Sequence, residues 1–135
     1  MLIKPIILYV IATITFFAID LTWLGLIARK FYFDQLGHLM KTDINWIAAI
    51  TFYLIFIVGI LVFAVYPALN SNSIQKALLL GALFGFIAYA TYDLTNLATL
   101  KDWPVKLVIV DMIWGAILSA SVAVITFYLS RYINL

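Results

Sequence analysis

The 135-residue sequence contains little charge, no cysteine and no glutamate. Charged residues make up 10% of the chain, whereas a soluble domain carries about 25%. Hydrophobic residues reach 67% and the mean hydropathy is +1.15, so lipid must act as the solvent of this chain. The formal net charge is only +2 and no basic run occurs, which argues against nucleic acid as a partner. The composition predicts an integral membrane protein in a lipid bilayer.

The missing residue types also exclude several kinds of site. Without cysteine, the chain has no disulfide, thiol relay or thiolate metal ligand. Because His38 is the single histidine, bis-histidine haem ligation and histidine-rich di-iron chemistry lack their ligands within this chain. No nucleophile motif or phosphate loop is recognisable. The sequence therefore predicts no metal site and no cofactor, and it favours a protein that is not an enzyme without excluding one.

Four apolar segments each reach roughly 20 residues, the length needed to cross a hydrocarbon core of about 30 Å. They are predicted near residues 5–28, 44–69, 74–100 and 104–129. The connection at residues 29–43 has the pattern of a short interfacial helix, and Ser73 is placed to cap the third span. We expect a single all-α domain, residues 1–135, folded as an integral membrane four-helix bundle.

Small residues and a repeated motif give further expectations about packing. The tight turn Lys101-Asp102-Trp103-Pro104 predicts a close hairpin of the third and fourth spans. Gly81-x-x-x-Gly85 and Gly115-x-x-x-Ser119 allow close contact between helices. The motif Asp20-Leu21-Thr22-Trp23 recurs in part as Asp93-Leu94-Thr95-Asn96, in two spans that run the same way. Two repeated helical hairpins are therefore an open interpretation.

The basic residues predict an orientation, although the two sides differ little. The first and third loops carry five basic residues, Arg29, Lys30, Lys41, Lys101 and Lys106. The other side carries three basic residues and the terminal amine. By the positive-inside rule, the first and third loops are expected in the cytoplasm.

Three aspartates, Asp20, Asp93 and Asp111, lie inside the predicted spans. Because helix direction alternates, all three fall roughly 10–12 Å inside the helix ends, on the side of the first and third loops. A carboxylate near the centre of a membrane helix costs about 2.5–3.5 kcal/mol, so these three should face one another or a polar cavity. No basic residue within the spans is placed to neutralise them. We expect at least one to hold a proton at neutral pH, and a proton, a cation or a cationic ligand group to compensate the others.

Aromatic and amide side chains accompany these acids at helical spacing. Polar residues of the third span recur at intervals of three and four, and an Asp-x-x-Trp motif begins at both Asp20 and Asp111. An indole one turn from an acid donates a hydrogen bond or forms an aromatic wall against a ligand. The predicted ligand- or ion-binding residues are Asp20, Asp93, Asp111, Trp23, Tyr89, Tyr92, Asn96 and Trp114. The competing interpretation is that they are hydrogen-bonded clasps between helices.

Three motifs of the spans occur together in a known family. They are Asp20-x-x-Trp23-Leu24-Gly25, the run from Tyr89 to Leu100 followed by Trp103-Pro104, and Asp111-x-x-Trp114-Gly115. With them the chain resembles the small bacterial membrane proteins catalogued as domain of unknown function 2177. The resemblance covers nearly the whole chain, and the third-span run is its most specific part. It implies a bacterial inner-membrane location and no particular activity.

Three functions stay open. The leading hypothesis is a ligand- or ion-binding membrane protein, such as a small transporter, whose aspartates bind a proton, a cation or an amine. Four helices enclose a narrow space, so a homodimer is also an open expectation. The second is a membrane-embedded enzyme or enzyme subunit acting on lipid, with an aspartate pair as acid and base or as ligands of a hard divalent metal. The third is a structural or assembly subunit whose aspartates bind a partner's helices.

Overall fold

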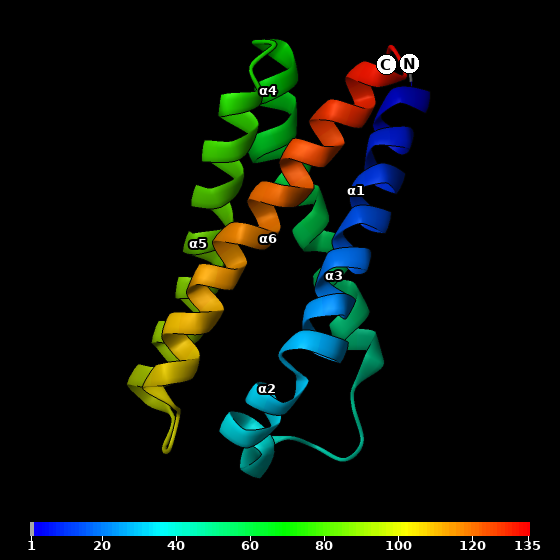
Figure 1. Ribbon diagram of the computed structural model, residues 1–135. Helices are drawn as coiled ribbons and strands as arrows, with labels where there is room; N and C mark the ends of the chain where they lie inside the picture. The colour runs from blue at the N-terminus through cyan, green and yellow to red at the C-terminus, as the bar shows by residue number, and fades with distance from the viewer. Residues whose placement is uncertain (1) are drawn as a thin grey trace.

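A computed structural model describes residues 2–135, which are helical nearly throughout (Figure 1). Within these residues, four helical stretches are long and apolar enough to cross a membrane: Ile3–Ile27, Trp46–Asn70, Ile74–Thr99 and Val105–Tyr132. The predicted all-α bundle with four spans is confirmed. The largest difference in a boundary is at the end of the fourth span, which continues three residues beyond the predicted Leu129.

The helices are named here in chain order. They are α1 (Ile3–Thr22), η1 (Trp23–Ile27), α2 (Arg29–Leu36), η2 (Gly37–Leu39), α3 (Trp46–Ile60), η3 (Leu61–Val65), α4 (Tyr66–Asn70), α5 (Ile74–Thr99) and α6 (Val105–Tyr132). The first span is α1 with η1, and the second is α3 with η3 and α4. A short helix, α2, does form in the first connection, as predicted.

Side-chain caps and left-handed turn residues set where the spans begin. Asn45 accepts a backbone hydrogen bond from the first turn of α3 at 3.1 Å, and Ser73 does the same for α5 at 3.3 Å. The cap predicted at Ser73 is therefore confirmed. Asn72 and Asp102 have φ values of 50° and 59°, which Asn and Asp tolerate better than most residues. These residues allow the sharp turns before α5 and before α6.

Two spans contain π-helical segments, η1 and η3, that apolar length alone does not predict. A π turn adds a residue to the helical turn and rotates the side chains that follow it. In the second span, η3 comes just before Pro67, whose ring offers no N–H to the helical hydrogen-bond ladder. In the first span, η1 holds Trp23 and Leu24 at the end of the bundle where the buried aspartates lie.

The hairpin of α5 and α6 is the closest contact in the bundle. A Cβ atom added at Gly81 would lie 2.9 Å from the backbone of Ala120, and one added at Gly85 would overlap the carbonyl oxygen of Gly115. The absence of side chains at these glycines lets the two backbones approach closely. The predicted close hairpin of the third and fourth spans is confirmed.

The four spans diverge toward one end of the molecule. In Figure 1, α5 and α6 lean away from α1 and α3 at the end where α2 lies. At the other end, where α1 begins and α6 ends, the bundle is filled by apolar side chains that include Leu8, Phe16, Ile57, Ile60 and Leu118.

Candidate ligand-binding cavity

The three aspartates predicted to lie in the spans are all buried at similar depth. Asp20 lies seven residues before the end of the first span, Asp93 six before the end of the third and Asp111 six after the start of the fourth. At 1.5 Å per residue, these positions are roughly 9–11 Å inside the helix ends, all at the α2 end of the bundle. Their exposed fractions are 3%, 0% and 8%.

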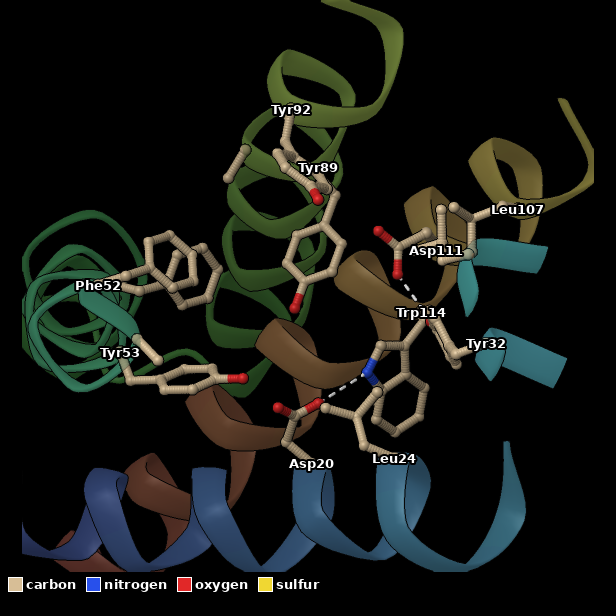
Figure 2. A pocket seen from close by; sticks show the side chains of 14 residues that line it. Asp20, Leu24, Tyr32, Phe52, Tyr53, Tyr89, Tyr92, Leu107, Asp111 and Trp114 are labelled. Atoms are coloured by element: carbon tan, nitrogen blue, oxygen red, sulfur yellow. Dashed lines mark hydrogen bonds between the residues drawn. The ribbon is translucent and has the colours of Figure 1, made fainter. Parts of the chain in front are cut away.

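The indoles of the two Asp-x-x-Trp motifs exchange partners between the first span and α6, and Figure 2 shows the bond that Trp114 makes to Asp20. Nε1 of Trp114 donates to Oδ1 of Asp20 at 3.1 Å. Nε1 of Trp23 donates to the hydroxyl of Tyr32 at 3.1 Å, and that hydroxyl donates to Oδ1 of Asp111 at 2.7 Å. The two indoles stack with ring centroids 4.3 Å apart and an interplanar angle of 10°. Trp114 thus bonds directly to the aspartate of the opposite span, whereas Trp23 reaches Asp111 only through the hydroxyl of Tyr32.

Tyr32 of α2 is a site residue that sequence reasoning missed. Its neighbours Lys30 and Asp34 form an ion pair of 2.6 Å on the exposed side of α2, while Tyr32 turns toward the bundle. Burial, with a contribution from the nearby Asp111, raises the pKa of Tyr32 above its ordinary value. The phenol therefore remains a hydrogen-bond donor throughout the neutral range.

Asp93 of α5 is fully buried in the interior of the bundle. Neither carboxylate oxygen of Asp93 has a hydrogen-bond partner within residues 2–135, although both are buried. Its carboxyl group adjoins that of Asp111. Adjoining carboxyl groups are tolerated in a nonpolar interior when they share a proton or when a cation lies between them.

A cavity of about 430 Å³ opens between α1, α2, α3, α5 and α6. Five of the eight predicted site residues line it: Asp20, Asp111, Trp114, Tyr89 and Tyr92. Tyr53 of α3 also lines it, and its hydroxyl points toward Asp20 (Figure 2). The hydroxyl of Tyr89 points into the same space (Figure 2). Two carboxylates and two phenols therefore converge on one volume.

The other three predicted residues lie outside the lining. Trp23 stacks on the far side of Trp114, and the carboxyl group of Asp93 adjoins that of Asp111. Asn96 is half-buried on α5, farther toward the loop than Asp93, and does not line the cavity. The structure therefore brings Trp23 and Asp93 into contact with the lining residues and leaves Asn96 apart from them.

Aromatic packing fixes the tyrosines that line the cavity. The ring of Tyr53 lies 5.5 Å from that of Phe16, and the ring of Tyr89 lies 6.0 Å from that of Phe56, measured between centroids. Such tilted contacts hold aromatic rings in a defined orientation. The available sequence signal for Tyr53 was a phenol within an otherwise apolar span.

The charges that line the cavity are of one sign. Asp20 and Asp111 are present, whereas no Lys, Arg or His is among the lining residues. Across the described part of the chain, residues 2–135, no group of three or more His, Cys, Asp or Glu side chains is arranged to hold a metal ion. The cavity suits a group that carries positive charge or donates hydrogen bonds.

Comparison with known proteins gives a family. Residues 5–128 match the sequence profile of a family described as "Predicted membrane protein (DUF2177)". The chain belongs to the DUF2177 family. The resemblance noted in the motifs is thereby confirmed. No curated protein and no solved structure matches the sequence of this DUF2177 protein.

Replacing Tyr32 with Phe in the DUF2177 protein tests the bridge between Trp23 and Asp111. We expect Tyr32→Phe to lower the free energy of unfolding by about 1–3 kcal/mol, because the half-buried indole of Trp23 loses its acceptor and the buried carboxylate of Asp111 loses a donor. The measurement is thermal unfolding in a mild detergent. Tyr128→Phe, at an exposed position of α6, is the matched control. Equal melting of the two variants would contradict a stabilising role for the bridge.

Proposed function

We propose that this protein binds a small cationic or hydrogen-bond-donating group inside the membrane, as a binding protein or small transporter. The observation that carries the proposal is the pair of carboxylates, Asp20 and Asp111, which line one cavity without a basic side chain beside them. The volume of about 430 Å³ falls within the roughly 300–1,000 Å³ typical of small-molecule sites. The proposed location is the bacterial inner membrane, and a homodimer is the proposed assembly.

The hydrogen bonds in the cavity leave the carboxylates able to bind a ligand. Asp20 accepts from Trp114 and Asp111 accepts from Tyr32. Since a carboxylate has about four acceptor sites, these bonds use only part of its capacity. Uncompensated burial of such charges costs several kcal/mol per ion. A proton, a cation or an ammonium group in the cavity would compensate that cost. The removal of the cost would supply the binding energy of the ligand.

The test is binding of labelled ethylammonium and tetramethylammonium in detergent, and their uptake into proteoliposomes at several pH values. Asp20→Asn and Asp111→Asn are each expected to weaken binding roughly tenfold or more, because the ammonium loses a carboxylate in a desolvated site. Asp102→Asn is the matched control, since it lies in the turn before α6 with a left-handed backbone that Asn also adopts. If both cavity variants bind and transport like the wild type, or if the wild type does neither, the proposal is wrong.

A purely structural role for the aspartates predicts a different result with the same variants. Hydrogen-bonded clasps would make Asp20→Asn and Asp111→Asn less thermally stable, with no loss of binding that is separable from unfolding. A ligand site predicts folded variants with weakened binding. Melting curves recorded with and without the amine separate these two outcomes, because a bound ligand raises the melting temperature of the protein that binds it.

A further inference from the structure

The most exposed side chains of the cavity lining indicate where it opens. Phe52 of α3 is 51% exposed and Tyr92 of α5 is 55% exposed. Leu107, which lines the cavity from α6, is buried. On the side of α1 and α6, the stacked rings of Trp23 and Trp114 close the gap between the helices. The mouth of the cavity therefore lies between α3 and α5.

The depth of this mouth places it in the lipid and not in water. Phe52 lies six residues after the start of α3, and Tyr92 lies seven before the end of α5. At 1.5 Å per residue, both are roughly 9–11 Å inside the helix ends. Toward the loops, Tyr32 and Leu36 of α2 line the cavity and separate it from that end. A molecule that enters between α3 and α5 must therefore come from the bilayer.

The inner surface of the cavity discriminates by charge. Asp20 and Asp111 meet the head group of any ligand, and the aromatic faces of Tyr53, Tyr89 and Trp114 add attraction for a cation. An anionic head group would meet two carboxylates, with no lining Lys, Arg or His as a partner.

Resting on the proposed function, we infer that the ligand is an amphipathic amine that enters sideways from the bilayer. Its ammonium group lies between Asp20 and Asp111, and its apolar chain passes between Phe52 and Tyr92 into the lipid. Two sources offer this chemistry, a bilayer lipid with an ammonium head group and a free long-chain amine. Both place a positive charge at the carboxylates without removing the chain from the membrane.

The first experiment compares three probes on the full chain in a nonionic detergent, with tryptophan fluorescence as the readout because Trp114 lines the cavity. We expect saturable binding of dodecylamine at concentrations roughly a hundredfold lower than for butylamine, because the longer chain adds apolar contact. Dodecanol, which has the chain without the charge, is expected not to saturate the signal. Dodecanol binding as tightly as dodecylamine would overturn the inference.

The same titration separates failure of this inference from failure of the proposed function. If butylamine binds as tightly as dodecylamine and both depend on Asp20, the chain contributes nothing and only the sideways entry is wrong. If neither amine binds, the proposed function is wrong as well.

A cross-link across the mouth tests the route directly, because the described chain contains no free cysteine of its own. Phe52→Cys with Tyr92→Cys, joined by a reducible bismaleimide, is expected to slow dodecylamine binding at least tenfold, and reduction of the linker is expected to restore it. Phe63→Cys with Phe84→Cys is the matched control, since these stacked rings join η3 to α5 outside the cavity. Unchanged binding kinetics in the cross-linked mouth variant would overturn entry between α3 and α5.

Nanodiscs of two compositions identify the source of the amine. If phosphatidylethanolamine is the ligand, discs that contain it are expected to raise the dodecylamine concentration needed for half-saturation, relative to discs of phosphatidylglycerol alone. Equal values in the two discs, with binding still dependent on Asp20 and Asp111, assign the site to a free amine. Tighter dodecylamine binding in the phosphatidylethanolamine discs would contradict a shared ammonium site.

Discussion

Gly85→Ala is expected to lower the free energy of unfolding by about 3 kcal/mol, the largest effect we predict for a single methyl group in this chain. The added carbon would overlap the carbonyl oxygen of Gly115 and meet the hydroxyl of Ser119. A backbone carbonyl in the middle of a paired helix cannot move aside without separating α5 from α6. Overpacking typically costs about 1–3 kcal/mol, and a clash with backbone belongs at the upper end of that range.

The measurement is the yield of monodisperse protein and its melting temperature in detergent. Gly25→Ala is the matched control, because no atom lies within 4 Å of the added carbon at that position in η1. We expect the control to remain within about 0.5 kcal/mol of the wild type, as substitutions away from packed contacts usually do. If Gly85→Ala and Gly25→Ala have the same melting temperature, the hairpin contact does not limit stability.

Trp114→Ala is expected to destabilise the protein by about 3 kcal/mol, the lower end of the range for buried Trp truncations, because Trp114 is half-buried. Trp114 stacks on Trp23 and donates to Asp20, so one substitution removes a ring contact and the donor of a buried carboxylate. Trp114 also lines the cavity, and its removal is expected to weaken amine binding in whatever protein remains folded. Melting curves and amine titrations measure the two effects.

Circular dichroism supplies a second readout for the same variant. Indoles stacked 4.3 Å apart couple their electronic transitions, so the wild type is expected to show an exciton couplet that Trp114→Ala lacks. Trp46→Ala is the matched control, because Trp46 is exposed at the start of α3. A couplet that survives in Trp114→Ala would show that the stacked pair is not its source.

The spans could be predicted from the sequence because apolar length decides them. Each predicted boundary lies within three residues of the observed one, and the cap at Ser73 follows from its place before an apolar run. The π turns η1 and η3 could not be predicted in this way, since they change the local winding of a helix without changing its hydropathy.

The cavity was predictable in part. Asp20, Asp93 and Asp111 stood out because each is costly in an apolar span, and helix direction alone put them at one depth. The sequence spacing suggested that each indole would contact its own aspartate. The observed exchange between α1 and α6 depends on how the two helices cross, which no spacing within one helix specifies.

Tyr32 and Tyr53 were missed for different physical reasons. Tyr32 lies between Phe31 and Phe33 in a connection whose pattern is that of a surface helix, and only the return of α2 under the bundle brings it to Asp111. Tyr53 lies in the second span, and a tyrosine in a span is commonly an interfacial anchor, so its presence alone does not indicate a site. Both residues contribute through contacts with helices distant in sequence, and such contacts have no local signal.

The exchange of partners between α1 and α6 also has a consequence for biogenesis. A ribosome releases the helices in order, so Asp20 enters the membrane long before Trp114 has been synthesised. During that interval the carboxylate of the first helix lacks the donor that holds it in the finished protein. A chain that stalls before α6 therefore leaves the carboxylate of Asp20 in the bilayer without its indole donor, at the energetic cost of an unsatisfied acid in lipid.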